Sequence, residues 1–396
     1  MITKLRLERF KNFKEAELHL GDLTLIVGTN ASGKSNIRDA FRFLHGLARG
    51  YKLAEIFGEK WVEGGVLQWR GIRGGTREVT FVGEETFALE VELNFLMNSV
   101  KKIVDYGIEV NSGHDVKVPE FKKQKFLILG EPPITERITF SIRRSLLHQN
   151  AEILSPNSEE LKARIEAAKE VISFLSSMRF LDLNPDAMRQ PSIPGQTILG
   201  DRGENLSSVL QDICLNPERK QTLLQWMQEL TPMDVVDFEF PTDFTGRTLL
   251  TLVEKNGTKI SAISASDGTL RFLAMIAALL GSEPAKLYFF EEIDNGIHPT
   301  RLHLLLQLIE RQVSQGKIQV VATTHSPQLL RLLSPQSLEY ASLTYRLADR
   351  PDAKIKRILD IPEAKRVIQE QDLARLHESG WLEDAVEFLE DEEIVE

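Results

Sequence analysis

Cysteine is almost absent from this sequence of 396 residues, which contains only Cys214. A single thiol allows no intramolecular disulfide, so the sequence favours a reducing compartment. Long hydrophobic runs are also missing, because the longest, Phe272 to Leu280, is far shorter than the roughly 20 residues that cross a bilayer. The first six residues lack the apolar core of a signal peptide. We therefore expect a cytoplasmic protein with no membrane partner.

An excess of positive charge is lacking as well, since the formal net charge is −10. This charge is unevenly distributed. Residues 383–396 carry eight carboxylates and no Lys or Arg, and without them the net charge would be −2. Such an end is typical of a solvated tail. The nearly neutral remainder leaves room for a local basic groove, so composition does not exclude a nucleic-acid partner.

The most informative stretch, residues 28–35, reads Gly-Thr-Asn-Ala-Ser-Gly-Lys-Ser and fits G-x-x-x-x-G-K-[ST]. It follows an apolar β-type run, Leu23–Val27, and precedes a predicted helix, Asn36–Leu47. Backbone N–H groups of such a loop and the positive end of the helix converge on one point, where phosphate binds. The stretch therefore predicts binding of a nucleoside triphosphate, with Lys34 near the β- and γ-phosphates and Ser35 on Mg²⁺. The expected phosphate-binding residues are Gly28, Asn30, Ala31, Ser32, Gly33, Lys34, Ser35 and Asn36.

Two adjacent carboxylates, Glu291 and Glu292, end the apolar run Leu287–Phe290. The carboxyl end of a buried strand is where ligands bind in α/β sheets. We assign Glu291 to the Mg²⁺ shell, and Glu292 to orienting and deprotonating the attacking water. His325 follows the next apolar strand, 318–322, and is placed to donate to a γ-phosphate oxygen.

Ser266-Asp267-Gly268 precedes the predicted helix Thr269–Leu280 and has two interpretations. A Ser and a Gly at a helix start form a second anion cradle. An ordinary N-cap by Ser266 or Asp267 explains the same residues. Spacing alone does not separate the two.

The order of predicted elements indicates an α/β fold with a parallel sheet covered on both faces. We expect residues 1–96 and 232–350 to form one nucleotide-binding domain, with a mostly helical insertion at 97–231 and a helical, acidic tail at 351–396. Locally, we expect one β segment at Leu18–Val27 and a glycine-rich loop at 58–76. We also expect a hairpin of 78–82 with 87–95, and helices at 157–178, 206–214 and 217–230.

In this order, the phosphate loop, Ser266-Asp267-Gly268, Phe289-Phe290-Glu291-Glu292 and His325 resemble an ABC-type ATPase head. More narrowly, they are similar to the SMC/RecF/OLD branch, especially the OLD-like ATPases common in bacterial defence systems. The resemblance covers most of residues 1–335. Three weaker sequence matches support it, namely Arg9–Phe13, Asp201–Leu206 and Gly296–Pro299. The fold implied is a mixed sheet with a parallel core around the phosphate loop, plus an antiparallel β segment.

The resemblance implies a homodimer or higher homo-oligomer in which two heads enclose two ATP molecules. Ser266 and Gly268 would contact the ATP of a second subunit, and Asp294 would fall in the segment that crosses that interface. Gln68 is a candidate to sense Mg²⁺ and the attacking water. Glu291 stands where Asp is more common, Ile293 where Pro often follows, and Ala265 replaces the usual Leu. None of these departures removes a group that the reaction needs, so we expect slow turnover.

The leading hypothesis is a Mg-ATP-dependent dimerisation switch that regulates an effector protein, such as a nuclease, in phage defence. The residues after Leu333 show no second catalytic centre.

The alternative is a RecF-like DNA-binding ATPase in DNA repair or maintenance. A basic cluster with aromatic neighbours suggests DNA contact, although such runs also form ordinary solvated faces. Its members are Lys117, Phe121, Lys122, Lys123, Lys125 and Phe126, with Arg143 and Arg144 nearby. A transporter ATPase is disfavoured, because Lys34 and Ser266 lie 232 positions apart.

Overall fold

The computed structural model describes residues 1–62, 66–97, 100–113, 118–129, 148, 159–231, 233–347, 350–361, 364 and 368. The acidic end at 383–396, Lys117, Asn157 and the Arg143-Arg144 pair lie outside the described residues. The chain divides into unit 1, residues 1–178 and 335–396, and unit 2, residues 179–334, and each is described by itself. Of the helices within the described ranges, none is both long and apolar enough to cross a membrane.

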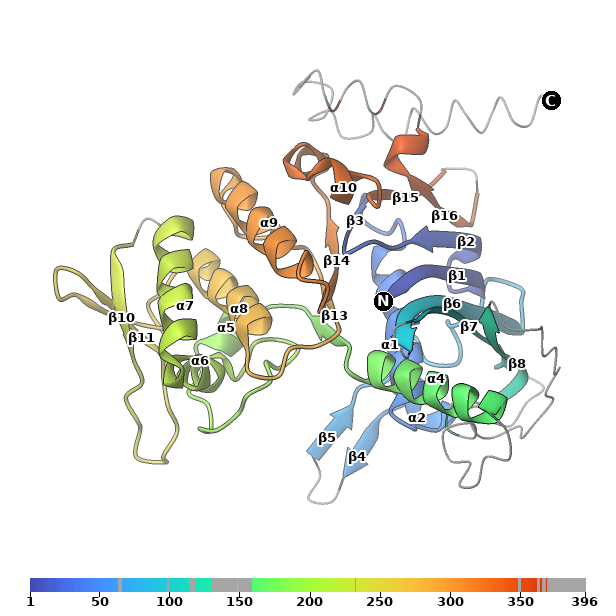
Figure 1. The fold of residues 1–396 in the computed structure, drawn as a ribbon, viewed down its shortest axis with the longest axis horizontal. Helices are drawn as coiled ribbons and strands as arrows, with labels where there is room; N and C mark the ends of the chain where they lie inside the picture. The colour runs from blue at the N-terminus through green and yellow to red at the C-terminus, as the bar shows by residue number, and fades with distance from the viewer. Residues whose placement is uncertain are drawn as a thin grey trace. The chain divides into compact units, whose positions relative to one another are not determined.

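Unit 1 contains a five-stranded antiparallel sheet in the order β2-β1-β6-β7-β8 (Figure 1). Buried apolar residues alternate with more exposed polar ones along the strands, so one face of the sheet packs into the core. On that face Phe10 and Phe87 pack ring against ring, with centroids 5.3 Å apart. The strands are β1 (Ile2–Phe10), β2 (Phe13–His19), β6 (Thr86–Met97), β7 (Val100–Asn111) and β8 (Glu120–Leu129).

Two local predictions are wrong in unit 1. Residues 78–82 form no strand; Thr80 makes an isolated bridge to Phe10, and β6 pairs instead with β1 and β7. The expected loop at 58–76 contains a hairpin of β4 (Lys60–Val62) and β5 (Val66–Trp69). The segment 97–231, expected to be a mostly helical insertion, begins with strands, because β7 and β8 continue the sheet across the predicted boundary after residue 96. It also contains the helices α4 to α7, which lie between residues 159 and 230. The sequence signal that we missed is the alternation of Val104, Tyr106, Ile108 and Val110 with polar residues.

The phosphate loop lies in unit 1 between β3 (Leu23–Val27) and α1 (Lys34–Ala48). All of β3 is buried, and it pairs in parallel with β15 (Ser342–Arg346), which pairs antiparallel with β16 (Ala353–Arg357). The predicted segment Leu18–Val27 is therefore two strands, β2 and β3, interrupted at residues 20–22. The region after residue 350, expected to be helical, begins with β16 because that strand extends the β15 edge.

Helix α4 (Glu159–Ser176) confirms the predicted helix at 157–178 as far as the described residues reach. It packs against α1. His45 on α1 lies with Nδ1 2.8 Å from the carbonyl oxygen of Leu175. Shorter helices of unit 1 are α2 (Leu53–Phe57), α10 (Pro335–Leu338) and the 3₁₀ turn η2 (Ile358–Asp360).

Unit 2 contains three parallel strands, with β13 (Leu287–Phe290) between β9 (Arg179–Leu181) and β14 (Gln319–Thr324). Every residue of β13 is buried, as expected for a strand with neighbours on both edges. Tyr288 anchors it to α8 (Asp267–Leu280), because its hydroxyl donates to Ala278 O at 2.5 Å and accepts from Ala285 N at 2.9 Å. Burial raises the pKa of this phenol. The strand thus presents its carboxyl end from a rigid base.

The remaining elements of unit 2 are helices and a three-stranded antiparallel sheet. Helices α6 (Leu206–Leu215) and α7 (Pro217–Leu230) are confirmed and pack on α8. The antiparallel strands β10 (Val235–Glu239), β11 (Thr251–Glu254) and β12 (Lys259–Ser261) precede α8. The other helical elements are α5 (Pro185–Met188), α9 (Pro299–Val313) and η1 (Pro327–Leu332).

Candidate functional site

The phosphate loop is shaped by close backbone approaches. A Cβ on Gly28 would collide with the carbonyl oxygen of Thr344, and a Cβ on Gly33 would lie 2.6 Å from Cζ of Phe13. Gly33 has a φ of 116°, in the left-handed region that glycine tolerates, and Ala31 has a φ of 64°. Both glycines of the motif are therefore required by geometry in this chain.

The polar groups of the loop fit a triphosphate. Lys34 is buried, and its Nζ donates to the carbonyls of Gly28, at 2.6 Å, and Thr29, at 2.7 Å. These are bonds that a phosphate oxygen can replace. Among the described residues, the Oγ of Ser32 is buried without a hydrogen-bond partner, and no side chain caps the start of α1. A buried orphan hydroxyl is costly, and an uncapped helix start attracts anions.

Side chains distant in sequence support the loop. The Asn12 side chain, in the turn between β1 and β2, accepts from Asn36 Nδ2 at 2.7 Å and lies against Gly33. Thr344, on β15, donates from Oγ1 to the carbonyl of Ser32 at 2.9 Å. Asn12 belongs to the Arg9–Phe13 stretch that the sequence singled out, whereas nothing in the sequence indicates Thr344.

A buried charge cluster fixes α1 beyond the loop. Asp39, which is 1% exposed, accepts from Lys11 Nζ at 2.5 Å and from Arg73 Nε at 3.1 Å. Arg38 lies 3.5 Å from its other oxygen. Burial lowers the pKa of Lys11, and the contact with Asp39 opposes that shift. The cluster ties the phosphate-loop helix to the β1–β2 turn and to the segment after β5.

In unit 2, the predicted catalytic residues lie together at the carboxyl ends of β13 and β14. Glu292 Oε1 lies 3.3 Å from His325 Nε2. Glu292 has a φ of 47°, a strained conformation that concentrates at functional sites. Glu291 is partly buried, and its backbone N donates to Leu181 O at 2.9 Å.

Two residues that sequence reasoning missed complete this turn. Thr323 accepts from Glu292 N through Oγ1 at 3.0 Å and from Ile293 N through its carbonyl at 3.0 Å. Asn295 donates from Nδ2 to Glu292 Oε2 at 3.0 Å. The position of Asn295, three residues after the acid, was the available signal, since residues three apart meet in a tight turn.

The start of α8 shows the N-cap that was one of the two interpretations. Ser266 Oγ accepts from Thr269 N at 3.2 Å and lies 2.8 Å from Thr269 Oγ1. A Cβ on Gly268 would lie 2.7 Å from Gly296 O, so close packing also explains this glycine. Neither contact excludes an anion at the exposed helix start, and that role stays a prediction.

Arg189, which follows α5, braces this helix start from both sides of Ser266. Its Nη2 donates to Ala265 O at 3.0 Å and to Asp267 Oδ1 at 2.6 Å. Asp186 accepts from Nη1 at 3.2 Å. The hydrogen bond with Asp267 raises the pKa of this guanidinium. No sequence signal linked Arg189 to a segment 76 residues away.

The remaining site predictions divide between the units. Gln68 belongs to unit 1 and lies exposed on β5 rather than in a loop, and its role toward Mg²⁺ stays a prediction. Within the described ranges, no three His, Cys, Asp or Glu side chains are grouped to hold a metal by themselves.

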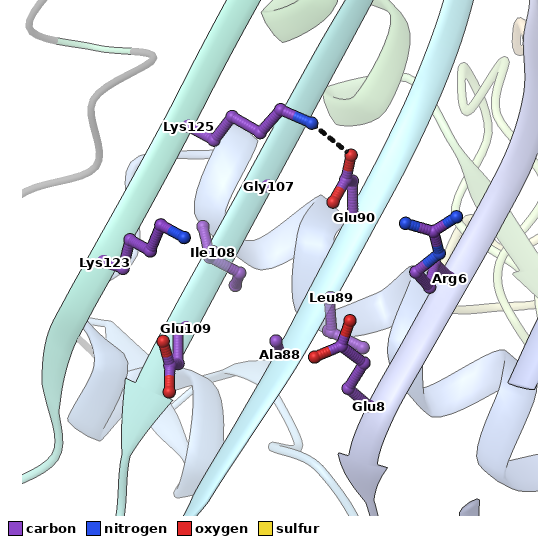
Figure 2. A pocket seen from close by; sticks show the side chains of 10 residues that line it. All are labelled: Arg6, Glu8, Ala88, Leu89, Glu90, Gly107, Ile108, Glu109, Lys123 and Lys125. Carbon is purple, nitrogen blue, oxygen red and sulfur yellow. Dashed lines mark hydrogen bonds and ion pairs between the residues drawn. The ribbon is translucent and has the colours of Figure 1, made fainter. Parts of the chain in front are cut away.

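The predicted DNA cluster lies on a sheet face of mixed charge (Figure 2). Lys125 Nζ lies 2.6 Å from Glu90 Oε1, and Lys122 Nζ lies 3.4 Å from Glu109 Oε1. Phe121 and Phe126 are 8% and 7% exposed, so they belong to the core and are unavailable for stacking on bases. The described part of the cluster is therefore not the basic, aromatic-lined surface that the sequence suggested.

Comparisons with known proteins found two informative similarities. An ATP/GTP phosphatase of Helicobacter pylori (strain ATCC 700392 / 26695) is 21% identical over 344 residues, which cover 84% of this chain and 87% of that protein. The crystal structure of an SMC head bound to the C-winged helix domain of ScpA has a TM-score of 0.52 at 15% identity, covering 90% of this chain and 97% of that one. The second likeness shows the fold, that of an ABC-type ATPase head.

Residues 23–331 match the family described as "AAA domain, putative AbiEii toxin, Type IV TA system". The matched range includes the phosphate loop, the start of α8 and the turn with Glu292. Because it spans more than half of the chain, the chain belongs to this family of AAA-domain ATPases.

Proposed function

We propose that this ATPase is a nucleotide-driven dimerisation switch, in which ATP bound to one copy is completed by the Ser266–Gly268 segment of a second copy. Hydrolysis then separates the copies. The observation that carries the proposal is the turn at Glu292, whose carboxylate contacts His325 and Asn295. The backbone of this turn is held by three hydrogen bonds within its own unit. A left-handed backbone at a residue other than glycine costs free energy of folding, and such strain concentrates at functional sites.

In this proposal the residues of unit 1 bind the triphosphate. Lys34 exchanges its bonds to Gly28 and Thr29 for phosphate oxygens, and Ser32 Oγ gains a partner.

Ser35, Glu291 and Gln68 would hold Mg²⁺ directly or through water. The ion supplies charge neutralisation on the phosphates.

The residues of unit 2 act on the water. Glu292 orients the attacking water and accepts its proton, as a general base within hydrogen-bond reach does. His325 donates to the γ-phosphate and senses its presence. Ser266 and Gly268 present the start of α8 to the phosphate of the other copy, where the helix dipole favours negative charge.

The test is Glu292→Gln, which keeps the size of the side chain and removes the base. We expect Mg-ATP turnover to fall by about 10²–10⁴-fold, while a two-subunit complex accumulates with ATP in light scattering. Glu218→Gln, an exposed carboxylate on α7, is the matched control and keeps normal turnover. Unchanged turnover in the Glu292 variant contradicts the assignment.

Dimerisation is tested separately with Ser266→Arg. The bulky cation at the exposed helix start is expected to abolish the ATP-dependent complex and leave ATP binding by single subunits intact. A dimer that forms equally well in this variant contradicts the bridging role of Ser266.

The wider role that we propose is control of an effector protein, such as a nuclease, in phage defence, in the manner of OLD-like ATPases. The family description, which names a toxin–antitoxin system, supports a part in conflict between a cell and its invaders. An infection assay with the chain and its neighbouring genes tests it. Protection that survives Glu292→Gln unchanged argues against an ATP-driven effector.

A further inference from the structure

The turn after β13 is closed by backbone hydrogen bonds. Asn295 N donates to Glu292 O at 2.9 Å, and Ile293 N donates to Thr323 O at 3.0 Å. Any residue other than proline at position 295 would supply the first of these bonds. The Asn295 side chain is therefore not needed to close the turn.

That side chain instead holds the carboxylate of Glu292. Its Nδ2 lies 3.0 Å from Oε2, while His325 Nε2 lies 3.3 Å from Oε1. Each oxygen of the acid thus has a nitrogen partner, one from the turn and one from the segment after β14. Because the Glu292 side chain is 49% exposed, it would otherwise be free to rotate among several rotamers.

The chemistry of an amide suits this task. Asn295 donates a hydrogen bond without adding charge, so the carboxylate stays anionic and keeps lone pairs for a water proton. A lysine at this position would pair with the acid, and an aspartate would repel it. The turn itself is immobilised on α8, because the carbonyl of Gly296 leaves no room for a Cβ on Gly268.

We propose that Asn295 is a positioning residue for ATP hydrolysis, which fixes the Glu292 carboxylate in the orientation that receives the water proton. The inference rests on the proposed function of Glu292. In the step concerned, the water oxygen bonds to the γ-phosphorus and the bond from that phosphorus to the bridging oxygen breaks. The proton passes to Glu292, and ADP leaves with the bridging oxygen.

Asn295→Ala and Asn295→Asp test the proposal in the full-length chain with Mg-ATP. We expect kcat to fall about tenfold for alanine, less than the roughly hundredfold loss caused by a 1 Å misplacement of a reacting group. We expect an equal or larger loss for aspartate, which keeps the turn but repels the acid. KM for ATP should change less than about twofold. Asn256→Ala, which removes another exposed turn asparagine of unit 2, is the matched control and keeps normal kcat.

The decisive measurement is the double variant. With Glu292→Gln already present, Asn295→Ala should change kcat by less than about twofold, because a positioning residue acts only through the group it positions. A purely structural role predicts losses that multiply, together with a lower unfolding temperature for Asn295→Ala alone.

Multiplying losses, or normal kcat in both single variants at position 295, overturns the inference. Normal turnover in Glu292→Gln instead overturns the proposed function itself, so the two failures are distinguishable.

Discussion

The phosphate loop of unit 1 and the acid turn of unit 2 are built in different ways. The loop is formed by backbone, with two glycines in tight places and a lysine held by main-chain carbonyls. The acid turn depends on side chains, since Asn295, His325 and Thr323 contact Glu292. A site formed by backbone consists of consecutive residues. A site formed by side chains also includes residues from distant segments, as His325 and Thr323 do here.

Asp39→Ala tests this contrast and should have the largest effect on the free energy of unfolding. It removes the centre of the side-chain cluster that supports the helix after the phosphate loop. The variant leaves Lys11, whose side chain is 8% exposed, without its carboxylate partner. We expect a loss of about 3–5 kcal/mol in the free energy of unfolding. Chemical denaturation measures it, with Asp22→Ala in the loop before β3 as the control. A loss below about 1 kcal/mol would mean that α1 does not depend on the cluster.

The same variant has a pH dependence of known sign. Burial already lowers the pKa of Lys11 from 10.5, and removing Asp39 takes away the contact that opposes this shift. The folded state then binds fewer protons than the unfolded state between the lowered pKa and 10.5, so stability rises with pH in that window. We expect the difference in the free energy of unfolding between the variant and the parent chain to narrow as the pH rises toward 10.5, measured by denaturation. If this difference in stability widens as the pH rises, Lys11 is not the group that destabilises the variant.

Gly28→Ala tests the backbone of the loop directly. The new Cβ would overlap the carbonyl oxygen of Thr344, which cannot move without distorting β15. We expect a cost of about 1–3 kcal/mol and a loss of ATP binding measured by calorimetry. Gly107→Ala is the control, because its Cβ would meet its neighbours at 3.5 Å or more. Equal ATP affinity in the two variants would show that the loop tolerates a side chain.

Arg189→Ala tests a side-chain brace of unit 2 with a smaller expected effect. The unpaired Asp267 carboxylate beside Ser266 would repel the triphosphate of a second copy, and we expect the ATP-dependent dimer to weaken about tenfold, or 1.4 kcal/mol. Asp267→Asn in the same chain should restore the dimer if charge is the cause. Failure of this rescue, seen by light scattering across subunit concentrations, would assign Arg189 to holding the Ala265 backbone alone.

The sequence predicted the site formed by backbone better than the site formed by side chains. The strand, loop and helix around residues 28–36, and the acid pair at the end of β13, were predicted because local patterns encode them. The brace from Arg189 was not, because no local pattern encodes a contact between separate segments. The bond from Asn295 was missed although its position three residues after Glu292 was a signal, because that spacing does not fix the rotamer of either side chain. The strands β7 and β8 were missed for another reason. Their alternation is present in the sequence, but it lies within the segment expected to be a mostly helical insertion, whereas the strands continue the sheet from β6.

Ser32→Ala has the smallest expected effect on stability and tests what the backbone-built loop is for. Its buried Oγ has no hydrogen-bond partner in the part of the chain that the structure describes, so its removal should stabilise the nucleotide-free protein by about 1 kcal/mol. If the hydroxyl instead binds a phosphate oxygen, the same variant should lose ATP affinity, and the stabilisation that ATP adds should shrink. Thermal unfolding with and without Mg-ATP measures both. If the variant is more stable than the parent chain without nucleotide but is stabilised less by ATP, the Ser32 hydroxyl lowers stability and contributes to ATP binding. If ATP stabilises the variant and the parent chain equally, Ser32 has no part in binding.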